Sequence, residues 1–113
     1  MIDINTLFVI VYLGIGVTIL FLCLPLLYNK IKMNYWYGFR ISQSFTSEEN
    51  WFAINQFGAK RFLRWNSVFF IIAFVTLVLP FETIPWLTII IGFLPVVILL
   101  FPLVEILLFA KNL

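Results

Sequence analysis

The sequence contains no histidine and only one cysteine, Cys23. These absences exclude a Cys/His metal site and a disulfide within the chain. Cys23 lies inside an apolar run, where we interpret it as a small apolar side chain. The sequence also has no nucleophile–base arrangement, no paired intramembrane carboxylates and no glycine-rich phosphate loop. We therefore predict that the protein is not an enzyme and that it needs no metal or cofactor.

Charged residues are scarce as well. They make up 11% of the 113 residues, whereas soluble domains carry about a quarter. The net charge of +2 makes nucleic acid a poor partner. Hydrophobic residues account for 64% of the chain, and a domain of this size buries only about two-thirds of its surface. The lipid bilayer is therefore the expected environment, and we predict an all-α membrane protein with a single domain over residues 1–113.

Three apolar runs predict transmembrane helices, at about residues 6–28, 62–80 and 84–109. The first run could also be a signal peptide, but only Asp3 precedes it and its basic residues follow it, so we expect a retained helix. The second run is the shortest, and Arg64 near its start can extend its charge to the headgroups. The third contains two prolines, which transmembrane helices tolerate. The short polar turn at residues 80–85 makes the last two helices antiparallel neighbours.

The basic residues indicate the orientation of these helices. They lie in or beside the first connector and at the C-terminus: Lys30, Lys32, Arg40, Lys60, Arg61, Arg64 and Lys111. The N-terminal segment and the second connector contain only the acids Asp3 and Glu82. The positive-inside rule then predicts a multi-pass protein with its N-terminus outside, and with its first connector and C-terminus in the cytoplasm.

The first connector, residues 29–61, contains a further helix signal. Its segment Thr46-Ser47-Glu48-Glu49 has the pattern of a capping box, which predicts a helix over about residues 47–60. The apolar positions of this helix recur at three- and four-residue spacing: Trp51, Ile54, Phe57 or Gly58, and Phe62. We expect this amphipathic helix to lie in the headgroup plane. The predicted fold is therefore three transmembrane helices plus one interfacial amphipathic helix.

An aromatic segment precedes this helix. Within it, Gly38 suits a positive φ angle or a close backbone contact. Arg40 could form a cation–π stack on Tyr37 or Trp36. Alternatively, it could form an ion pair with Glu48 or Glu49. On physical grounds alone, the connector is better interpreted as a membrane-surface elbow, held by caps and aromatic anchors, than as a binding site.

The spacing of polar, glycine and aromatic residues in the connector resembles the signature of the SdpI family. The residues that carry the resemblance are Asn34, Gly38, Arg40, Ser44, Ser47, Glu48, Glu49, Trp51, Asn55 and Gly58. Two positions depart from the family pattern: Ile41 stands where a threonine is usual, and Met33 stands where a proline is common. The prototype of the family is longer and has additional spans.

This resemblance implies a bacterial cell-membrane protein, because the family is named for the immunity protein of a secreted killing peptide. It implies immunity to, or sensing of, a membrane-active antimicrobial peptide, with the signature residues as the functional ones and the peptide toxin as a partner. One alternative is a small accessory or structural subunit of a larger membrane complex. Another is a subunit of a transporter or channel. These alternatives predict a membrane protein or a second copy of the chain as the partner.

Glu105 is a carboxylate in the third apolar run. An acid in such surroundings is a functional candidate by default. The other interpretation is that it pairs with a cation near the interface, namely Lys111, Arg64 or Arg61. We favour structural pairing over a contact with a ligand or toxin.

Overall fold

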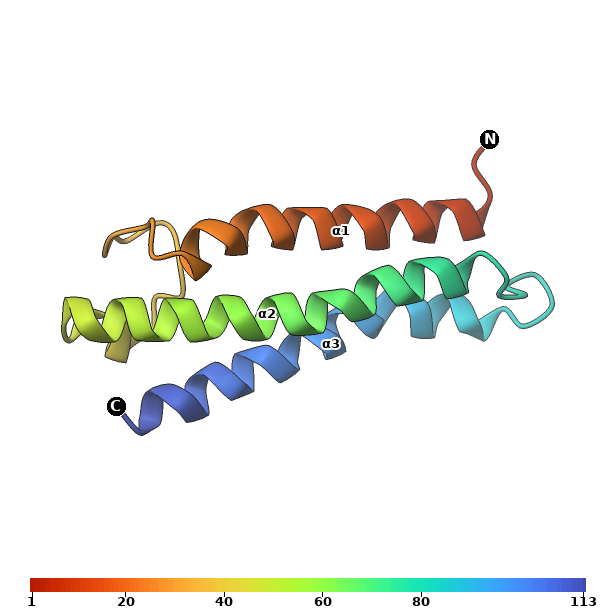
Figure 1. Cartoon of the computed structure of the whole chain (residues 1–113). Helices are drawn as coiled ribbons and strands as arrows, with labels where there is room; N and C mark the ends of the chain where they lie inside the picture. Colours follow the sequence, from red (N-terminus) through yellow and green to blue (C-terminus); the bar gives the residue numbers. More distant parts are fainter.

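The computed structural model describes residues 1–113 and is entirely helical. It consists of α1 (Ile4–Leu27), the short 3₁₀ helix η1 (Ser42–Phe45), α2 (Glu48–Thr76) and α3 (Trp86–Lys111). The three long helices run alternately up and down (Figure 1), so that the N-terminus and the α2–α3 turn lie at one end. The connector between α1 and α2 lies with the C-terminus at the other end. The bundle measures 53 × 23 × 20 Å.

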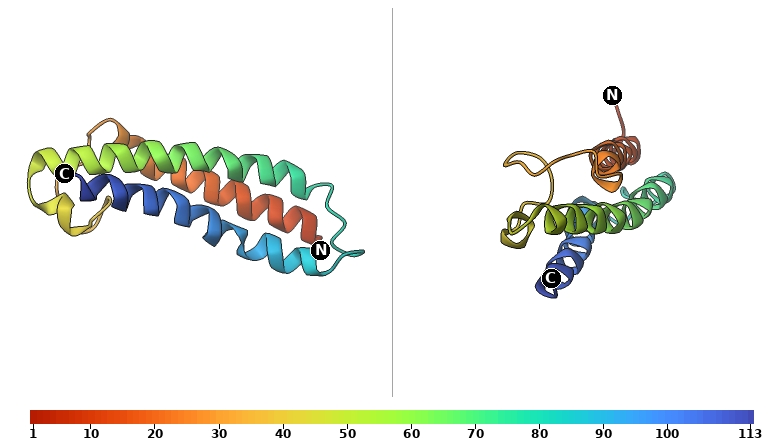
Figure 2. Two further views of the ribbon diagram at one scale, coloured as in Figure 1. Left: turned by 90° about the horizontal axis from the view of Figure 1, so that it is seen from below. Right: turned by 60° about the vertical axis from the view of Figure 1, so that its left-hand side comes forward.

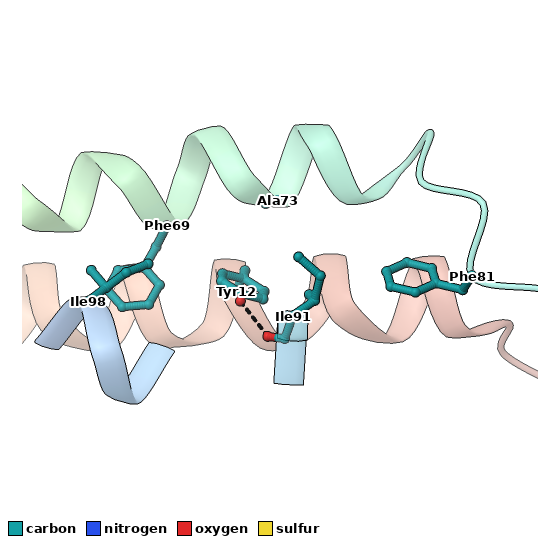
Figure 3. Packing of buried hydrophobic residues seen from close by; sticks show 6 residues of the cluster. All are labelled: Tyr12, Phe69, Ala73, Phe81, Ile91 and Ile98. Atoms are coloured by element: carbon teal, nitrogen blue, oxygen red, sulfur yellow. Dashed lines mark hydrogen bonds between the residues drawn. The ribbon is translucent and has the colours of Figure 1, made fainter. Parts of the chain in front are cut away.

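The helix α2 lies between the other two. It packs along α1 and against α3, whereas α1 and α3 have few contacts with each other. The right-hand view of Figure 2 shows α1 and α3 on opposite sides of α2. One core cluster near the α2–α3 turn joins all three helices through Tyr12, Phe69, Ala73, Phe81, Ile91 and Ile98 (Figure 3). Two smaller clusters lie near the connector, one between α1 and α2 and the other between α2 and α3.

Two of the helices, α1 and α3, are long and apolar enough to cross a membrane. Only 17% of the apolar stretch of each is buried, so neither resembles the core helix of a soluble protein. Their outer faces carry large exposed apolar side chains, among them Phe21 and Phe93, which are 71% and 68% exposed. Such broad apolar surfaces are typical of contact with lipid. These helices therefore support a membrane protein.

The ends of α1 are both capped. Asp3 accepts a 2.7 Å hydrogen bond from the backbone N–H of Thr6, and the bonds from Thr6 lower the pKa of the Asp3 carboxyl. At the other end, Asn29 adopts a φ of 57°. This left-handed residue lets the N–H of Lys30 reach the carbonyl of Pro25 at 2.9 Å, the pattern of a Schellman motif. The connector therefore leaves α1 in a defined direction.

The predicted interfacial helix and the predicted second span form one helix, α2. The sequence predicted a break between Lys60 and Phe62, because charged residues interrupt the apolar run there. The backbone continues through this point because no proline lies between Glu48 and Thr76. The prediction of a separate helix lying in the headgroup plane is therefore wrong.

The N-terminal cap of α2 is also one residue later than the capping box predicted. Ser47 accepts a 3.0 Å hydrogen bond from the backbone N–H of Asn50, so Ser47 is the cap. The hydroxyl of Thr46 instead donates to the carbonyl of Gln43 at 2.8 Å, which closes η1. The helix begins at Glu48.

Side chains fix how α1 and α2 align. The amide of Asn5, at the start of α1, donates to the carbonyl of Thr76 at 2.7 Å. At the opposite end, the amide of Gln56 donates to the carbonyl of Leu27 at 3.1 Å. Residues 56–76 of α2 therefore lie level with α1, and the first turns of α2 extend beyond it. The connector folds onto this extension.

Candidate functional site

Because α2 begins at Glu48, the connector of the structure is residues 28–47, shorter than the predicted 29–61. It folds against the N-terminal half of α2. An Asx-type turn at Asn34 starts this fold, because its side-chain oxygen accepts bonds from the backbone N–H groups of Trp36 at 2.9 Å and Tyr37 at 2.7 Å. The hydroxyl of Tyr37 then donates to the carbonyl of Leu22 in α1. These contacts hold the aromatic segment between α1 and α2.

Gly38 and Asn55 form the tightest contact of the connector with α2. Gly38 has a φ of +120°, as its position in the sequence predicted. The side chain of Asn55 accepts a 2.6 Å bond from the N–H of Phe39 and donates a 2.9 Å bond to the carbonyl of Trp51. A Cβ atom on Gly38 would lie 2.6 Å from the Asn55 oxygen. Both the φ angle and the space therefore require glycine here.

Trp51 is a core residue of this junction and is 0% exposed. Its indole N–H donates to the carbonyl of Ile31 at 2.9 Å, and its ring lies 5.6 Å from that of Phe45. From the sequence, Trp51 was expected on the apolar side of an interfacial helix, buried in the membrane. That placement is wrong, because the connector covers this face of α2.

Gly58 creates room for Phe39. A Cβ atom on Gly58 would lie 2.5 Å from the Phe39 ring and 3.0 Å from Ile106 in α3. The Phe39 ring also packs on Phe62, with centroids 5.1 Å apart. Phe39 was not singled out from the sequence, although the small residue facing it was. It inserts between α2 and α3 and links the connector to both.

The serines and acids of the signature complete the junction. The hydroxyl of Ser44 is buried and donates to the carbonyl of Phe39 at 2.6 Å, while Ser47 caps α2. Glu48 and Glu49 are exposed in the first turn of α2, where the helix dipole favours negative charge. Most signature residues thus hold the connector against α2 rather than forming a reactive centre.

Arg40 is the only cation among the signature residues, and it is exposed. Its guanidinium donates to the backbone carbonyl of Tyr35. Neither arrangement expected from the sequence occurs: Arg40 stacks on no aromatic ring, and it pairs with neither Glu48 nor Glu49. Its guanidinium therefore keeps donors that no acid of the chain satisfies.

Two cavities flank the connector. The larger, about 590 Å³, lies between the connector and α3 and is lined by Tyr35, Gly38, Phe39, Arg40, Ile41, Phe45, Leu103, Ile106 and Leu107. The smaller, about 310 Å³, lies between the connector and α1 and is lined by Ile19, Leu22, Cys23, Leu26, Trp36, Tyr37, Gly38, Phe39 and Phe62. Gly38 and Phe39 line both cavities, so the junction that they form separates the two spaces.

Glu105 lines neither of these two cavities. One carboxylate oxygen pairs with the guanidinium of Arg61 at 3.0 Å, and the other accepts a 2.5 Å bond from the indole N–H of Trp65. The expected structural pairing of Glu105 is thus present, with Arg61 as the cation. Trp65 was not anticipated, because nothing in the sequence indicates that it faces Glu105. The pair connects α2 to α3.

A model of the SdpI/YfhL protein family matches residues 30–103. The chain belongs to this family. The match begins in the connector, includes every signature residue and ends in α3. No curated protein and no solved structure matches the chain.

One departure from the usual SdpI pattern has a structural role in this chain. Ile41 lines the larger cavity and packs against the buried cluster of Ile54, Ile106 and Ala110. The isoleucine therefore adds an apolar contact between the connector and α3. In this SdpI-family protein, the connector is attached to α3 as well as to α2.

Proposed function

We propose that this SdpI-family chain is a multi-pass protein of the bacterial cell membrane that gives immunity to a membrane-active antimicrobial peptide, or senses it. The observation that carries the proposal is the family match, because the SdpI family is a family of membrane immunity proteins. Its signature residues lie in the connector and in the N-terminal half of α2, and they hold these two segments together.

Three spans are proposed, although only α1 and α3 are apolar enough on their own. The support comes from the alignment of residues 56–76 of α2 with α1. If α1 crosses the bilayer, this stretch of α2 lies at the same depth. Lys60 is only about 6 Å along the helix from Gln56 and can extend its charge to the headgroups. Arg61 is paired with Glu105, which lowers the cost of its position.

The proposed orientation has the N-terminus outside and the connector in the cytoplasm. Lys30, Lys32 and Arg40 belong to the connector, and Lys111 ends α3 beside it. Lys60 and Arg61 lie in the N-terminal half of α2, and Arg64 lies just past its middle. The segment before α1 and the α2–α3 turn contain no Lys or Arg, so the positive-inside rule favours this orientation. In this orientation the connector forms a fixed cytoplasmic platform beneath the spans. The spans bind or exclude the peptide within the bilayer, and the platform holds them in one arrangement.

The direct test is survival of cells with and without the protein under a panel of membrane-active peptides. We expect selective protection from at least one peptide, with the amount of protein in the membrane measured by immunoblot. Arg40→Gln tests the platform, because Arg40 is exposed and its replacement leaves the core intact. Arg64→Gln is the matched control, since Arg64 is also exposed but does not line the cavity.

The expected result is that Arg40→Gln weakens protection and Arg64→Gln preserves it at equal membrane abundance. Equal protection by both variants would show that protection does not depend on the charge of Arg40. An absence of protection from every peptide, with normal insertion, would contradict immunity. That result would favour an accessory subunit of a membrane complex, which native purification would detect as a partner chain of fixed stoichiometry.

A further inference from the structure

The larger cavity combines an apolar lining with a single cation. Seven of its nine lining residues are hydrophobic, and Arg40 is the only charged one. Its volume of about 590 Å³ lies within the range of small-molecule sites, about 300–1,000 Å³. The cavity is therefore large enough for part of an amphiphile.

The guanidinium of Arg40 is suited to a phosphate group. Arginine offers five N–H donors, and one nitrogen of Arg40 donates to the carbonyl of Tyr35. No carboxylate pairs with Arg40, because the only ion pair of the chain joins Arg61 to Glu105. Unused guanidinium donors match the geometry of phosphate oxygens, which they bind in pairs.

The surroundings of Arg40 favour a ligand that is anionic as a whole. Residues 28–47 contain Lys30, Lys32 and Arg40 but no aspartate or glutamate. A cluster of cations beside a membrane-spanning helix attracts anionic lipid. Charge complementarity therefore points to the anionic headgroups of a bilayer leaflet.

The opposite wall of the cavity lies on α3. Leu103 and Leu107 are one helical turn apart, line the cavity, and are 43% and 53% exposed. Because α3 is apolar enough to span a membrane, these side chains face lipid. The cavity therefore places the cation of Arg40 next to the apolar surface formed by Leu103 and Leu107.

We propose that this cavity binds one anionic phospholipid, with its phosphate on the Arg40 guanidinium and an acyl chain along Leu103 and Leu107. The lipid links the connector to α3 from the membrane side. This site goes beyond the proposed immunity function, because lipid is retained with no peptide present. Either proposal can therefore fail without the other.

Native mass spectrometry of the purified full chain in detergent tests the site. The protein is offered phosphatidylglycerol or phosphatidylcholine at equal concentration. We expect one phosphatidylglycerol to be retained in preference to phosphatidylcholine. Arg40→Gln should lower this retention about tenfold, because hydrogen bonds to a charged group are lost. Arg64→Gln should retain lipid as the original chain does.

A second pair of variants tests the apolar wall. Leu107→Trp narrows the cavity without touching Arg40, and we expect it to reduce phosphatidylglycerol retention. Leu108→Trp is its control, since Leu108 is exposed on the next position of α3 and does not line the cavity. Loss of retention in Leu107→Trp alone would support an acyl chain in the cavity. Equal retention by the two variants would overturn it.

Other outcomes would also overturn the proposal. These are equal retention of the two lipids, equal retention by Arg40→Gln and Arg64→Gln, and displacement of the lipid by inorganic phosphate alone. The last result would mean that the site recognises free phosphate. A photoreactive residue in place of Leu107 that crosslinks to a second copy of the chain, and not to lipid, would identify a protein occupant instead.

Discussion

The hydroxyl of Tyr12 donates a 2.6 Å hydrogen bond to the carbonyl of Ile91. Within a regular helix this carbonyl would accept the N–H of residue 95, but Pro95 has none. Tyr12 is fully buried, and it supplies from α1 the bond that α3 lacks (Figure 3). A similar arrangement occurs where Asn5 donates to the carbonyl of Thr76, four residues before Pro80. Prolines thus free two of the carbonyls that accept hydrogen bonds between the helices.

Tyr12→Phe should lower stability because it leaves the Ile91 carbonyl without a partner in the core. We expect a loss of about 1–3 kcal/mol. The measurement is unfolding of the purified protein in detergent micelles, followed by circular dichroism. Phenylalanine preserves the packing of the Tyr12 ring on Phe69, whose centroids are 5.9 Å apart. The change therefore isolates the hydroxyl.

Pro95→Ala provides the control for this bond. Alanine restores a backbone N–H that can bond the Ile91 carbonyl within α3. Tyr12→Phe should therefore lower the free energy of unfolding by less in the Pro95→Ala background than in the original chain. Equal costs in the two backgrounds would show that Tyr12 does not compensate for Pro95.

The two helical glycines Gly58 and Gly92 should respond in opposite directions to alanine. Gly58→Ala forces a Cβ atom into the Phe39 ring, whereas nothing lies within 4 Å of a Cβ on Gly92. Gly92→Ala should stabilise α3 by about 1 kcal/mol through helix propensity. Gly58→Ala should destabilise the protein and release the connector, which limited proteolysis between residues 30 and 47 would detect. Equal protease resistance of the two variants would contradict the role of Gly58.

The Arg61–Glu105 pair should contribute little to stability but should affect the α2–α3 contact. Both side chains are partly exposed, 33% for Arg61 and 28% for Glu105, so we expect Arg61→Gln to cost at most about 1 kcal/mol. Lys60→Gln is the control, because Lys60 is exposed and unpaired. A double-mutant cycle of Arg61→Gln with Glu105→Gln measures the coupling. A coupling energy of zero would mean that Arg61 and Glu105 lie close together without stabilising the protein.

Much of the helical organisation follows from local patterns. The long apolar runs gave α1 and α3 to within a few residues of their ends. The acids Glu48 and Glu49 after a serine located the start of α2, because capping depends on adjacent residues. The predicted end of the connector helix near Lys60 is wrong, because Lys60 and Arg61 interrupt the apolar pattern while the helix continues through them. Continuity of a helix depends on the absence of proline more than on uniform hydrophobicity.

The junction could be predicted only in part. The sequence alone predicts that Gly38 can adopt a positive φ angle, and the structure confirms this with a φ of 120°. The sequence does not show that Asn55 binds the backbone at Phe39, because that contact spans 16 residues and depends on how the connector folds back. Trp51 was placed in lipid for the same reason: an apolar helix face is equally suited to lipid and to a covering segment. Only the tertiary arrangement distinguishes the two.

Cysteine labelling of intact cells should determine whether α2 crosses the membrane. In a Cys23→Ala background, Glu82→Cys places one thiol in the exposed α2–α3 turn, and Lys32→Cys places one in the exposed connector. A membrane-impermeant maleimide should label Glu82→Cys on intact cells. It should label Lys32→Cys only after lysis, since the basic connector is expected in the cytoplasm. Labelling of both sites from outside would contradict a crossing by α2, and the reversed pattern would contradict the orientation while preserving the three spans.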